Sequence, residues 1–449
     1  MSYDIIVIGC GSGGYEAALL CSRLGGKVAV VEAEDIGGTC VNRGCIPSKV
    51  WHRAATMWQA IDGCESFGIR VSGKKLDYKT VVGRKNKVSQ DIRTGMEAML
   101  SGNGIELIRG RGILKSPREI EVGEKTYQTK KVIIASGSSL DIPEIAGLRE
   151  TAMTTDDVLN MDRIPASVLI YGDGYIEVEK AHLLNALGAK VILATPAARI
   201  LEKEDHETSQ RITQVLRDRQ VQVVPRVMLQ SIRNTGGKVE CIFSGPKEQT
   251  MEAGKILIAA RKPNVTGMGL NALGIKLNND GGIEVNDRLE TSVDGVYAIG
   301  DATGGWMLSH AASSMASTAA MNAMGRTNLF PFHLVPRGVW TTPEMGAVGL
   351  SEEEAEKKGY DVEVASFPFA INGLAMCRDE QEGAVKIVAD AKYGEILGVH
   401  IVGSQATELV GEAVLAMQLQ STVGEFARSI RVHPTFSEAL VQAMRGVDI

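Results

Sequence analysis

Short apolar runs alternate with helical repeats over the first third of the chain. Residues 4–8, 27–31 and 131–134 are such runs, each apolar after a leading charged residue (Asp4, Lys27 and Lys131). Continuous apolar runs of this length are typical of parallel strands that are buried on both faces. Amphipathic repeats that end at Leu24 and recur over residues 50–100 predict helices between the strands. The alternation predicts an α/β fold built on a parallel sheet.

The same order of strand, glycine-rich turn, helix and strand returns in the middle of the chain. Residues 168–171 are apolar, a helical repeat runs to Leu187, and residues 190–194 form the next apolar run. The chain is therefore predicted to contain two Rossmann-like dinucleotide-binding domains. Near the end, short strands at residues 383–388 and 396–399 mix with helices and predict a C-terminal α+β domain.

The first glycine-rich turn has the full dinucleotide-binding fingerprint. Gly9, Gly11 and Gly14 follow the first strand in the order G-x-G-x-x-G, and Glu32 ends the second strand. Backbone N–H groups at the start of the helix are suited to a pyrophosphate, and the acid is suited to a ribose hydroxyl. A glycine-rich turn without a ligand is the alternative, but the flanking strands and the acid make it the weaker one.

The second glycine-rich turn is incomplete. Gly172 and Gly174 are in place, but Glu177 stands where the third glycine belongs, and the next strand ends at Thr195 without an acid. The third glycine normally permits close packing of helix against strand. The side chain of Glu177 must therefore point elsewhere or push the helix away.

Two cysteines five positions apart stand out within residues 37–49. In a regular helix Cys40 and Cys45 would be separated by roughly 7.5 Å along the axis, and a disulfide needs Cα atoms within about 7 Å. A tightened turn at Gly44, with Pro47 in the first turn of a following helix, would bring them together. A helix beginning near Cys45 would also favour a thiolate there. We expect a redox-active disulfide; buried free thiols, or half of a metal site, are the alternatives, although no second pair completes such a site.

Small or polar residues end several later strands. Ser136, Gly137 and Ser138 close one apolar run and would let the backbone approach a ligand. Residues 255–261 are predicted to form another strand, and the strand ending at Asp301 offers an acid for a ribose or ribityl hydroxyl. A helix N-cap is an equally good interpretation of Asp301.

A histidine near the end of the chain is the remaining candidate for acid–base chemistry. His433 lies in a turn marked by proline, and Glu438 follows five positions later. The carboxylate would fix the tautomer of the imidazole. A lone histidine is more often structural, but a dithiol substrate must lose a proton before it attacks a disulfide, so a base has a use here.

Composition and charge narrow the class of protein. The chain has 449 residues, with 48 basic against 54 acidic side chains, a formal charge of −6 and seven cysteines. This balance does not favour nucleic acid or an anionic membrane surface as a partner, and no apolar run reaches the ~18 residues of a membrane span. Few, scattered cysteines favour a reducing compartment, for which we expect the cytoplasm.

Taken together, residues 37–49, 298–301 and 433–438 resemble the corresponding segments of the flavoprotein disulfide reductases. The resemblance covers essentially the whole chain and implies FAD and NAD as cofactors. It implies an FAD-binding domain at residues 1–145 and an NAD-binding domain at residues 146–265. A central domain at 266–331 would complete the FAD site, and 332–449 would form the dimerisation domain.

The resemblance also implies which residues contact the cofactors. The residues implied for FAD are Gly9, Gly11, Gly14, Glu32, Gly38, Thr39, Lys49, Gly112, Ser136, Gly137, Ser138, Asp301, Met307, Leu308, Ser309 and His310. The residues implied for NAD are Gly172, Gly174, Tyr175, Glu179 and Ala260, with Glu179 also paired to Lys49. No metal site is implied.

The mechanism implied by the resemblance is a dithiol–disulfide exchange. A dihydrolipoyl thiolate would attack Cys40, the more accessible thiol, and Cys45 would leave as a thiolate next to the flavin. His433 of the partner subunit of a homodimer would accept the proton, oriented by Glu438, with Lys49 beside the flavin. The implied partner is the lipoyl domain of a 2-oxoacid dehydrogenase or glycine cleavage complex.

Departures from the family pattern gather at the nicotinamide site. Glu177, Thr195 and Ala260 replace a small residue, an acid and a glycine, and Arg431 stands where a second histidine is common. We therefore expect weak nicotinamide binding, with NAD favoured over NADP. A related disulfide or mercuric reductase, and a flavin redox protein with a decayed nicotinamide site, remain as alternatives. A mercuric reductase would need a C-terminal cysteine pair, and no cysteine follows Cys377.

Overall fold

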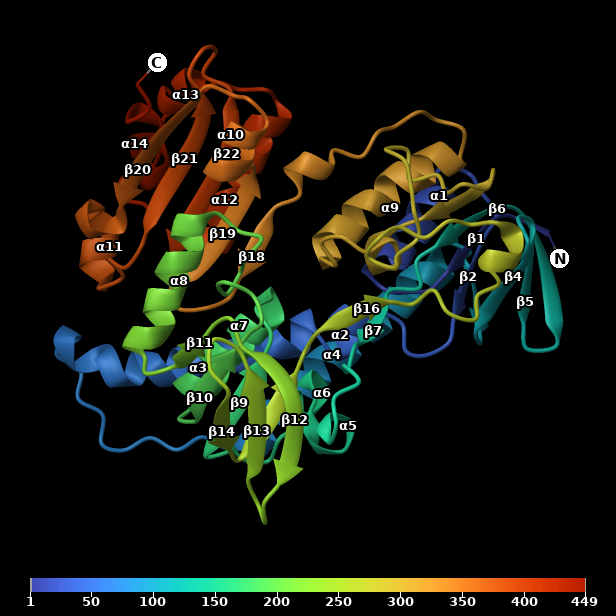
Figure 1. Ribbon diagram of the computed structural model, residues 1–449. Helices are drawn as coiled ribbons and strands as arrows, with labels where there is room; N and C mark the ends of the chain where they lie inside the picture. Colours follow the sequence, from blue (N-terminus) through green and yellow to red (C-terminus); the bar gives the residue numbers. More distant parts are fainter. Residues whose placement is uncertain (1, 449) are drawn as a thin grey trace.

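The structure, a computed structural model, describes residues 2–448 and contains three bodies, each built around its own sheet (Figure 1). The first body has a seven-stranded sheet in the order β3-β2-β1-β6-β5-β4, with β17 paired to β6. Its strands are β1 (Ser2–Ile8), β2 (Val28–Glu32), β3 (Glu106–Arg109), β4 (Gly112–Ser116), β5 (Glu119–Val122), β6 (Lys125–Ile134) and β17 (Val296–Ala298). The pairs β1–β2, β1–β6, β2–β3 and β6–β17 are parallel, as the continuous apolar runs predicted.

Two helices from opposite halves of the chain lie side by side on this sheet. They are α1 (Ser12–Arg23) and α9 (Ser309–Ala323), and α9 presents mostly alanines to α1 (Figure 1). The small side chains let the two helices approach closely. Their N-termini meet, because the hydroxyls of Ser12 and Ser309 are 2.6 Å apart.

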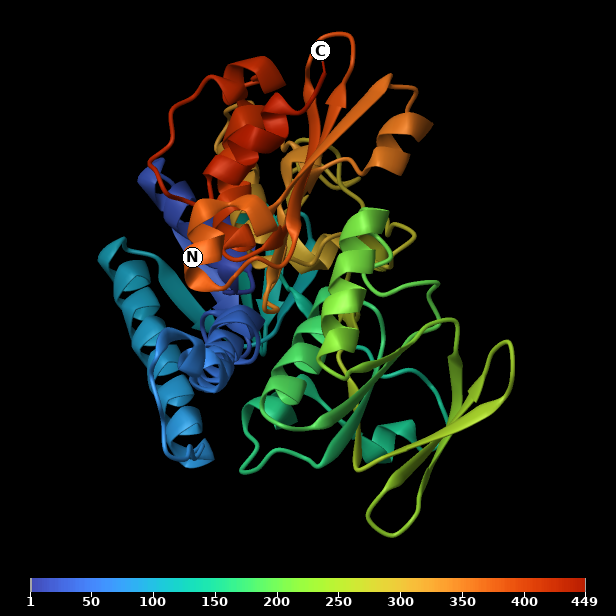
Figure 2. The same ribbon diagram turned by 90° about the vertical axis from the view of Figure 1, so that its left-hand side faces the viewer.

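The second body repeats the parallel design with fewer strands. Its sheet has the order β11-β10-β9-β15-β8, and a three-stranded antiparallel sheet, β12-β13-β14, projects from it (Figure 2). The strands are β8 (Ala152–Met153), β9 (Ser167–Tyr171), β10 (Lys190–Ala194), β11 (Gln222–Val224), β12 (Met228–Asn234), β13 (Val239–Ser244), β14 (Gln249–Ala253) and β15 (Lys255–Ile258). The helices are α5 (Leu148–Thr151), α6 (Thr155–Leu159), α7 (Tyr175–Ala186) and α8 (His206–Asp218).

One predicted strand is divided in the structure. Residues 255–261 were expected to form a single strand, but β15 ends at Ile258 and a separate strand, β16 (Arg261–Pro263), begins at Arg261. The reason is a change of partner: β15 pairs with β9, whereas β16 pairs antiparallel with β7 (Ser138–Leu140). The break brings Arg261 into the space between the first two bodies.

Three helices after β2 carry the cysteine motif. They are α2 (Gly38–Asn42), α3 (Cys45–Gly63) and α4 (Tyr78–Gly102). Trp51 of α3 is fully buried. Because α3 contacts both α4 and α7, it joins the first body to the second.

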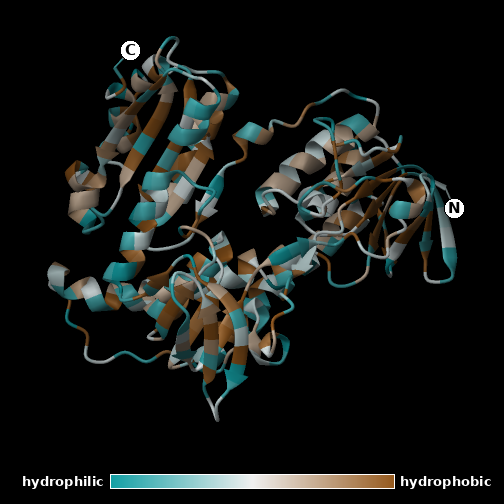
Figure 3. Ribbon diagram, in the orientation of Figure 1, coloured by the Kyte–Doolittle hydropathy of each residue, from teal (hydrophilic) through white to brown (hydrophobic). Residues whose placement is uncertain are grey.

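The third body is the predicted α+β domain. Its antiparallel sheet has the order β18-β19-β22-β21-β20. The strands are β18 (Arg337–Val339), β19 (Glu344–Gly349), β20 (Val362–Pro368), β21 (Ala384–Asp390) and β22 (Ile396–Gly403), and the helices are α10 (Glu352–Lys357), α11 (Gly373–Arg378), α12 (Ala406–Gln418), α13 (Val423–Ala427) and α14 (Glu438–Arg445). Figure 3 shows hydrophobic residues along the strands of all three bodies. Within residues 2–448 no helix is long and apolar enough to cross a membrane.

Candidate active site

The first glycine-rich turn forms an open cradle at the N-terminus of α1. A methyl group placed on Gly11 would meet only the Cα of Gly38, at 3.9 Å, so the space beside the turn is free. Gly9 has φ +102°, and a methyl group there would lie 2.2 Å from the carbonyl oxygen of Ala135. Gly38 has φ +56° and borders the same cradle. The turn, a helix N-terminus and clear space together fit the pyrophosphate of a dinucleotide.

Glu32 completes this fit at the end of β2. It is 9% exposed, and its two carboxylate oxygens accept hydrogen bonds from the backbone N–H groups of Cys10, at 2.6 Å, and Glu34, at 2.8 Å. A carboxylate has about four lone-pair positions, so each oxygen can still accept a ribose hydroxyl. The residues of the first body therefore fit FAD, the cofactor that the sequence predicted.

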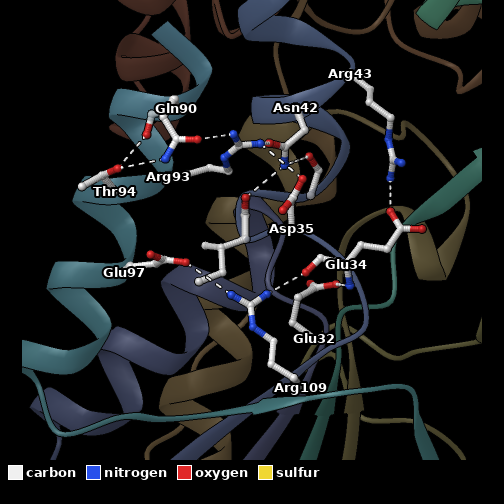
Figure 4. Close-up of polar contacts among 12 residues, drawn as sticks. Glu32, Glu34, Asp35, Asn42, Arg43, Gln90, Arg93, Thr94, Glu97 and Arg109 are labelled. Carbon is white, nitrogen blue, oxygen red and sulfur yellow. Dashed lines mark hydrogen bonds and ion pairs between the residues drawn. The ribbon is translucent and has the colours of Figure 1, made fainter. Parts of the chain in front are cut away.

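Arginine side chains hold the segment between Glu32 and the cysteines (Figure 4). Arg93 of α4 donates hydrogen bonds to Asp35, at 3.2 Å, and to the amide oxygen of Asn42, at 2.9 Å. The amide nitrogen of Asn42 donates in turn to the carbonyl oxygens of Ile36 and Gly38. These contacts fix α2, and with it the position of Cys40, against the long helix α4.

Cys40 and Cys45 come together as two free thiols. Cys40 lies in the short helix α2, Cys45 begins α3, and Gly44 is the N-cap of α3, as the predicted turn requires. Cys40 is half-buried and Cys45 is exposed. This order of accessibility is the reverse of the expected one, because Cys40 packs against the hydroxyls of Ser12 and Ser309 at the two helix N-termini.

The two thiols share a proton, and Cys40 is the one that is disposed to ionise. A hydrogen bond from Cys45 is the largest cause that lowers the pKa of Cys40, to about 6, with further help from Ser309, Ser12 and Lys49 against the effect of burial. The same hydrogen bond to Cys40 is the largest cause that raises the pKa of Cys45. The expectation of a thiolate at Cys45 is therefore not met in this dithiol form, because Cys45 is the donor of the shared proton.

Lys49 faces the second body. Its ammonium lies 3.1 and 3.2 Å from the two carboxylate oxygens of Glu179 in α7, and 3.6 Å from the centre of the Trp340 ring. Burial alone would raise the pKa of Glu179, but Lys49, then His52 and Lys180, hold it far below its usual value. The predicted Lys49–Glu179 pair is thus formed, and Trp340 adds a contact that no sequence motif indicated.

A buried polar cluster behind Lys49 was also missed. Lys180 is 3% exposed and its ammonium donates to the hydroxyl of Ser48; burial lowers its pKa to about 8. His52 and His182 are stacked with ring centres 6.5 Å apart, and burial lowers the pKa of both, that of His182 to about 3. The sequence shows only a lysine and two histidines on apolar helix faces. Their spacing does not indicate that the three side chains come together behind Lys49.

Arg261 is a further residue that the motifs did not reveal. Its guanidinium donates to the hydroxyl and the carbonyl oxygen of Ser138, at 2.8 and 2.5 Å, and to the hydroxyl of Thr39 at 3.2 Å. The hydroxyl of Ser138 donates to the carboxylate of Asp301. Asp301 does not cap a helix, because Ile299 occupies the N-cap position without a side-chain bond. Arg261 thus contacts Ser138 and Thr39, and Ser138 links it to Asp301; all three partners were predicted to bind FAD.

The other residues predicted for FAD lie around the same cradle in different roles. Gly112 is a packing position, since a methyl group there would lie 3.2 Å from Ile8 and 3.3 Å from Val31. The hydroxyl of Ser136 donates to the carbonyl oxygen of Asn264, whereas Gly137 has open space beside it.

The residues predicted for FAD within 307–310 lie at the N-terminus of α9. Met307 has φ +48°, Leu308 is the N-cap, and His310 contacts the carbonyl oxygen of Pro336 at 2.6 Å.

The second glycine-rich turn has no such open space. Glu177 is 5% exposed, and its carboxylate lies against Gly172 and Gly174. The helix is not pushed off the sheet, since α7 keeps its contacts with β9 and β10. Tyr175 points away, and its hydroxyl donates to Glu204 at 2.5 Å. The carbonyl oxygen of Ala260 accepts from the backbone N–H of Asp141. As they stand, these residues do not fit a dinucleotide.

His433 and Glu438 form the predicted pair on the third body. Nδ1 of His433 lies 2.9 Å from the carboxylate of Glu438, and 79% of the His433 side chain is exposed. A hydrogen bond from the backbone N–H of Thr435, and then one from His433, lower the pKa of Glu438. Helix α14, which begins at Glu438, packs on β20, β21 and α13, in a different body from the cysteines (Figure 1). One chain alone therefore does not assemble all the predicted catalytic residues.

Comparison with known proteins agrees with the fold and the cysteine motif. Residues 3–316 match the family described as pyridine nucleotide-disulphide oxidoreductase, and residues 335–444 match the dimerisation domain of that family. A dihydrolipoyl dehydrogenase of Thermus scotoductus is 38% identical over 451 residues, which cover 99% of this chain and 97% of the relative. A dihydrolipoyl dehydrogenase of Bacillus subtilis is 35% identical over 466 residues, with 99% and 98% covered.

Solved structures of two related proteins superpose on the chain. The Cu(II) complex of RclA, an HOCl-induced flavoprotein disulfide reductase from Escherichia coli, has a TM-score of 0.88 at 25% identity, with 99% of both chains covered. LpdA from Mycobacterium tuberculosis has a TM-score of 0.90 at 24% identity, with 98% and 99% covered. The predicted fold class is confirmed by these matches.

Proposed function

The chain belongs to the pyridine nucleotide-disulphide oxidoreductase family, and we propose that within this family it oxidises dihydrolipoyl groups with NAD. It is an FAD-dependent oxidoreductase, and FAD and NAD are the cofactors of the family. The observation that carries the proposal is the dithiol pair beside an open dinucleotide cradle, in which Cys40 has a lowered pKa. Bound FAD supplies the two-electron redox chemistry that side chains lack.

The exchange with the substrate uses three side chains of the protein. In the disulfide form, one substrate thiolate attacks the sulfur of Cys40, and the bond to Cys45 breaks with the electron pair on Cys45. The second substrate thiol then closes the substrate disulfide and releases Cys40. One substrate proton goes to His433, and the other stays between the two cysteines, where the shared-proton geometry holds it. The step removes two electrons and two protons from the substrate.

A second subunit is needed to bring His433 to the cysteines. The match of residues 335–444 to a dimerisation domain supports a homodimer. Ile430 and Val432, next to His433, are 97% and 77% exposed, which is unusual for apolar side chains and is suited to burial against a partner. We propose an isologous interface on the order of 2,000 Å² or more in total. A fully active monomer in sedimentation would contradict this arrangement.

The domain assignments and the carrier protein are part of the same proposal. Residues 1–145 and 266–331 would hold FAD, residues 146–265 NAD, and residues 332–449 the interface. The curated relatives are named dihydrolipoyl dehydrogenases, which favours the lipoyl domain of a 2-oxoacid dehydrogenase or glycine cleavage complex as the substrate carrier. The cytoplasmic location expected from the sequence stays a prediction.

A second candidate function is supported by the second glycine-rich turn. The carboxylate of Glu177 beside Gly172 and Gly174 favours a flavin redox protein whose electrons leave to an acceptor other than a nicotinamide. Steady-state oxidation of dihydrolipoamide with NAD, with NADP and with an artificial acceptor distinguishes the two. Turnover with NAD supports the first function, and turnover with the artificial acceptor alone supports the second.

The cysteine pair is tested by substitution. Cys45→Ser leaves Cys40 without a disulfide partner, so we expect it to abolish dihydrolipoamide turnover while FAD stays bound. Cys377→Ser, at an exposed cysteine outside the site, is the matched control and should keep full activity. Replacing His433 by Gln should lower turnover by about 10²- to 10⁴-fold, the usual contribution of a general acid–base. Substantial activity of Cys45→Ser would refute the proposed exchange.

A further inference from the structure

We infer that Glu177 is a residue that limits the affinity of the nicotinamide site, because its carboxylate occupies the cradle that the pyrophosphate of a dinucleotide requires. The inference rests on the proposed function, since it concerns the acceptor side of the same reaction. The effect is one of physical occupation, because a dinucleotide has to displace the side chain before it can dock.

The geometry of the second turn places the carboxylate in the cradle. Helix α7 has 12 residues and begins after Gly174, its N-cap. A methyl group placed on Gly174 would lie 2.8 Å from Oε2 of Glu177, and one on Gly172 would lie 3.0 Å from Oε1. In a dinucleotide-binding turn, the second glycine keeps this space clear so that the backbone can approach the pyrophosphate. In this chain the space is filled by the protein itself.

The carboxylate also uses the groups that would bind the phosphate. Burial raises the pKa of Glu177 to about 7, while the backbone N–H groups of Glu177 itself and of Gly174 act in the opposite direction by hydrogen bonding to the ionised form. These N–H groups belong to the N-terminus of α7, where a phosphate oxygen would accept the same bonds. The Glu177 carboxyl group therefore occupies the N–H groups that a phosphate would need at the helix N-terminus.

The charged groups that act on Glu177 and on its neighbour Asp173 are acidic. Asp173, in the same turn, is the charged group that acts on Glu177, and Glu202, from the segment after β10, acts on Asp173. Among residues 2–448, Glu177 has no ion pair with a basic side chain. An incoming pyrophosphate would therefore meet the carboxyl groups of Glu177, Asp173 and Glu202 at the turn.

Occupation of the cradle should act on affinity and leave the choice between NAD and NADP unchanged. NAD and NADP carry the same pyrophosphate, so Glu177 should weaken both by the same factor. The position that normally distinguishes them, at the end of β10, holds Thr195, which is fully buried and has no charge. Removal of the Glu177 carboxylate should therefore tighten both nucleotides without changing their ratio.

The test is direct titration of the FAD-loaded protein with NAD and with NADP by calorimetry. We expect Glu177→Gly to bind both nucleotides at least about tenfold more tightly. Glu177→Ala, which keeps a Cβ and a better helix propensity, should follow it if the glycine variant folds poorly. Glu177→Gln has the same size without the charge and should stay within about threefold of the parent. FAD content and the rate of Cys40 alkylation should be unchanged in all three.

Three results would overturn the inference. They are an unchanged affinity in the glycine and alanine variants, a glutamine variant that binds as tightly as the glycine variant, and a gain restricted to one nucleotide. The proposed function can fail independently of the inference, because oxidation of dihydrolipoamide with an artificial acceptor does not involve the second turn. If that oxidation is absent but the nucleotide titrations give the expected results, the proposed function is refuted and the inference holds.

Discussion

The two nucleotide-binding bodies of this chain share one plan and differ at the turn that meets the ligand. Beside Gly11 there is open space to 3.9 Å, whereas beside Gly174 a carboxylate oxygen lies at 2.8 Å. The acid Glu32 ends β2 of the first body, and Thr195 follows β10 of the second. The sheet and helix thus persist when the third glycine is lost, because the new side chain can turn into the space reserved for the ligand.

The neighbours of each turn make the contrast stronger. In the first body, Ser12 and Ser309 at two helix N-termini stabilise the Cys40 thiolate, and Arg261 joins Ser138 to Thr39. In the second body, carboxyl groups gather at the turn instead. The first turn is surrounded by groups that support an anion, and the second is already filled by a carboxyl group.

The largest expected effect comes from closing the first cradle. Gly11→Ala has room in the folded protein, since its methyl group would meet only Gly38. The methyl group would occupy the approach of the pyrophosphate, and we expect FAD to bind about 100-fold more weakly, the loss of roughly two hydrogen bonds to a charged group. Flavin fluorescence titration of the apoprotein measures the affinity, and circular dichroism checks the fold. Gly174→Ala is the matched control and should leave FAD binding unchanged; undiminished FAD affinity in Gly11→Ala would show that this turn is not the cradle.

Rebuilding the second turn on the pattern of the first should create selectivity. Thr195→Glu in the Glu177→Gly background restores both features that the first body has. An acid at the strand end accepts ribose hydroxyls and repels a 2′-phosphate, so we expect NAD to bind about tenfold more tightly than NADP, or roughly 1.4 kcal/mol. The ratio of the two dissociation constants is the measurement. Thr195→Gln in the same background is the control, and equal ratios in the two double variants would argue against a role for charge at this position.

The pH dependence of Cys40 tests the support that the first body gives to an anion. Because the pKa of Cys40 is lowered to about 6, its thiolate should persist at neutral pH and be lost only below pH 6. We expect alkylation of the reduced protein at Cys40 to be half-maximal near that pH and to fall about tenfold per unit below it. Peptide mapping separates Cys40 from Cys45. Ser12→Ala should move the midpoint upward, and a midpoint above pH 8 in the parent would mean that Cys40 is an ordinary thiol.

The smallest expected effect is the pH dependence of NAD binding. In the cradle the pKa of Glu177 is raised to about 7 by burial, against an ordinary value of 4.5. Displacement into solvent returns the pKa toward the ordinary value, so a proton is released between these two pH values. NAD affinity should therefore fall about eightfold from pH 7.5 to pH 6, and level off above pH 7.5. Glu177→Gln should show no such slope. A rise in affinity at low pH would mean that the carboxyl group stays in the cradle in its protonated form.

Much of the fold follows from local patterns that are visible in the sequence. The apolar runs at residues 4–8 and 168–171, with helices ending near Leu24 and Leu187, appear as β1, β9, α1 and α7 within a few residues. Periodicity is a local property, so it survives without knowledge of the tertiary structure. The break between β15 and β16 was missed, because it depends on which strand each half pairs with.

The candidate site could be predicted only where its functional residues lie close together in the sequence. The cysteine pair, the first fingerprint and the pair of His433 with Glu438 each lie within a short stretch, and each was found from its spacing. Lys180, His52 and His182 were not found, because burial brings them together from α3 and α7. Arg261 was missed for the same reason, since its partners Thr39 and Ser138 are distant in the sequence.

The sequence by itself determined that this chain has two dinucleotide folds, a reactive pair of cysteines and an anomaly at Glu177. The sequence could not say whether the Glu177 carboxylate leaves the turn, displaces the helix or fills the cradle. The tertiary structure shows that it fills the cradle. It also decided that Cys40, and not Cys45, carries the lowered pKa. The physical reason is common to both: charge and hydrogen bonding act over a few ångströms, and the groups found at that distance are set by packing between distant segments.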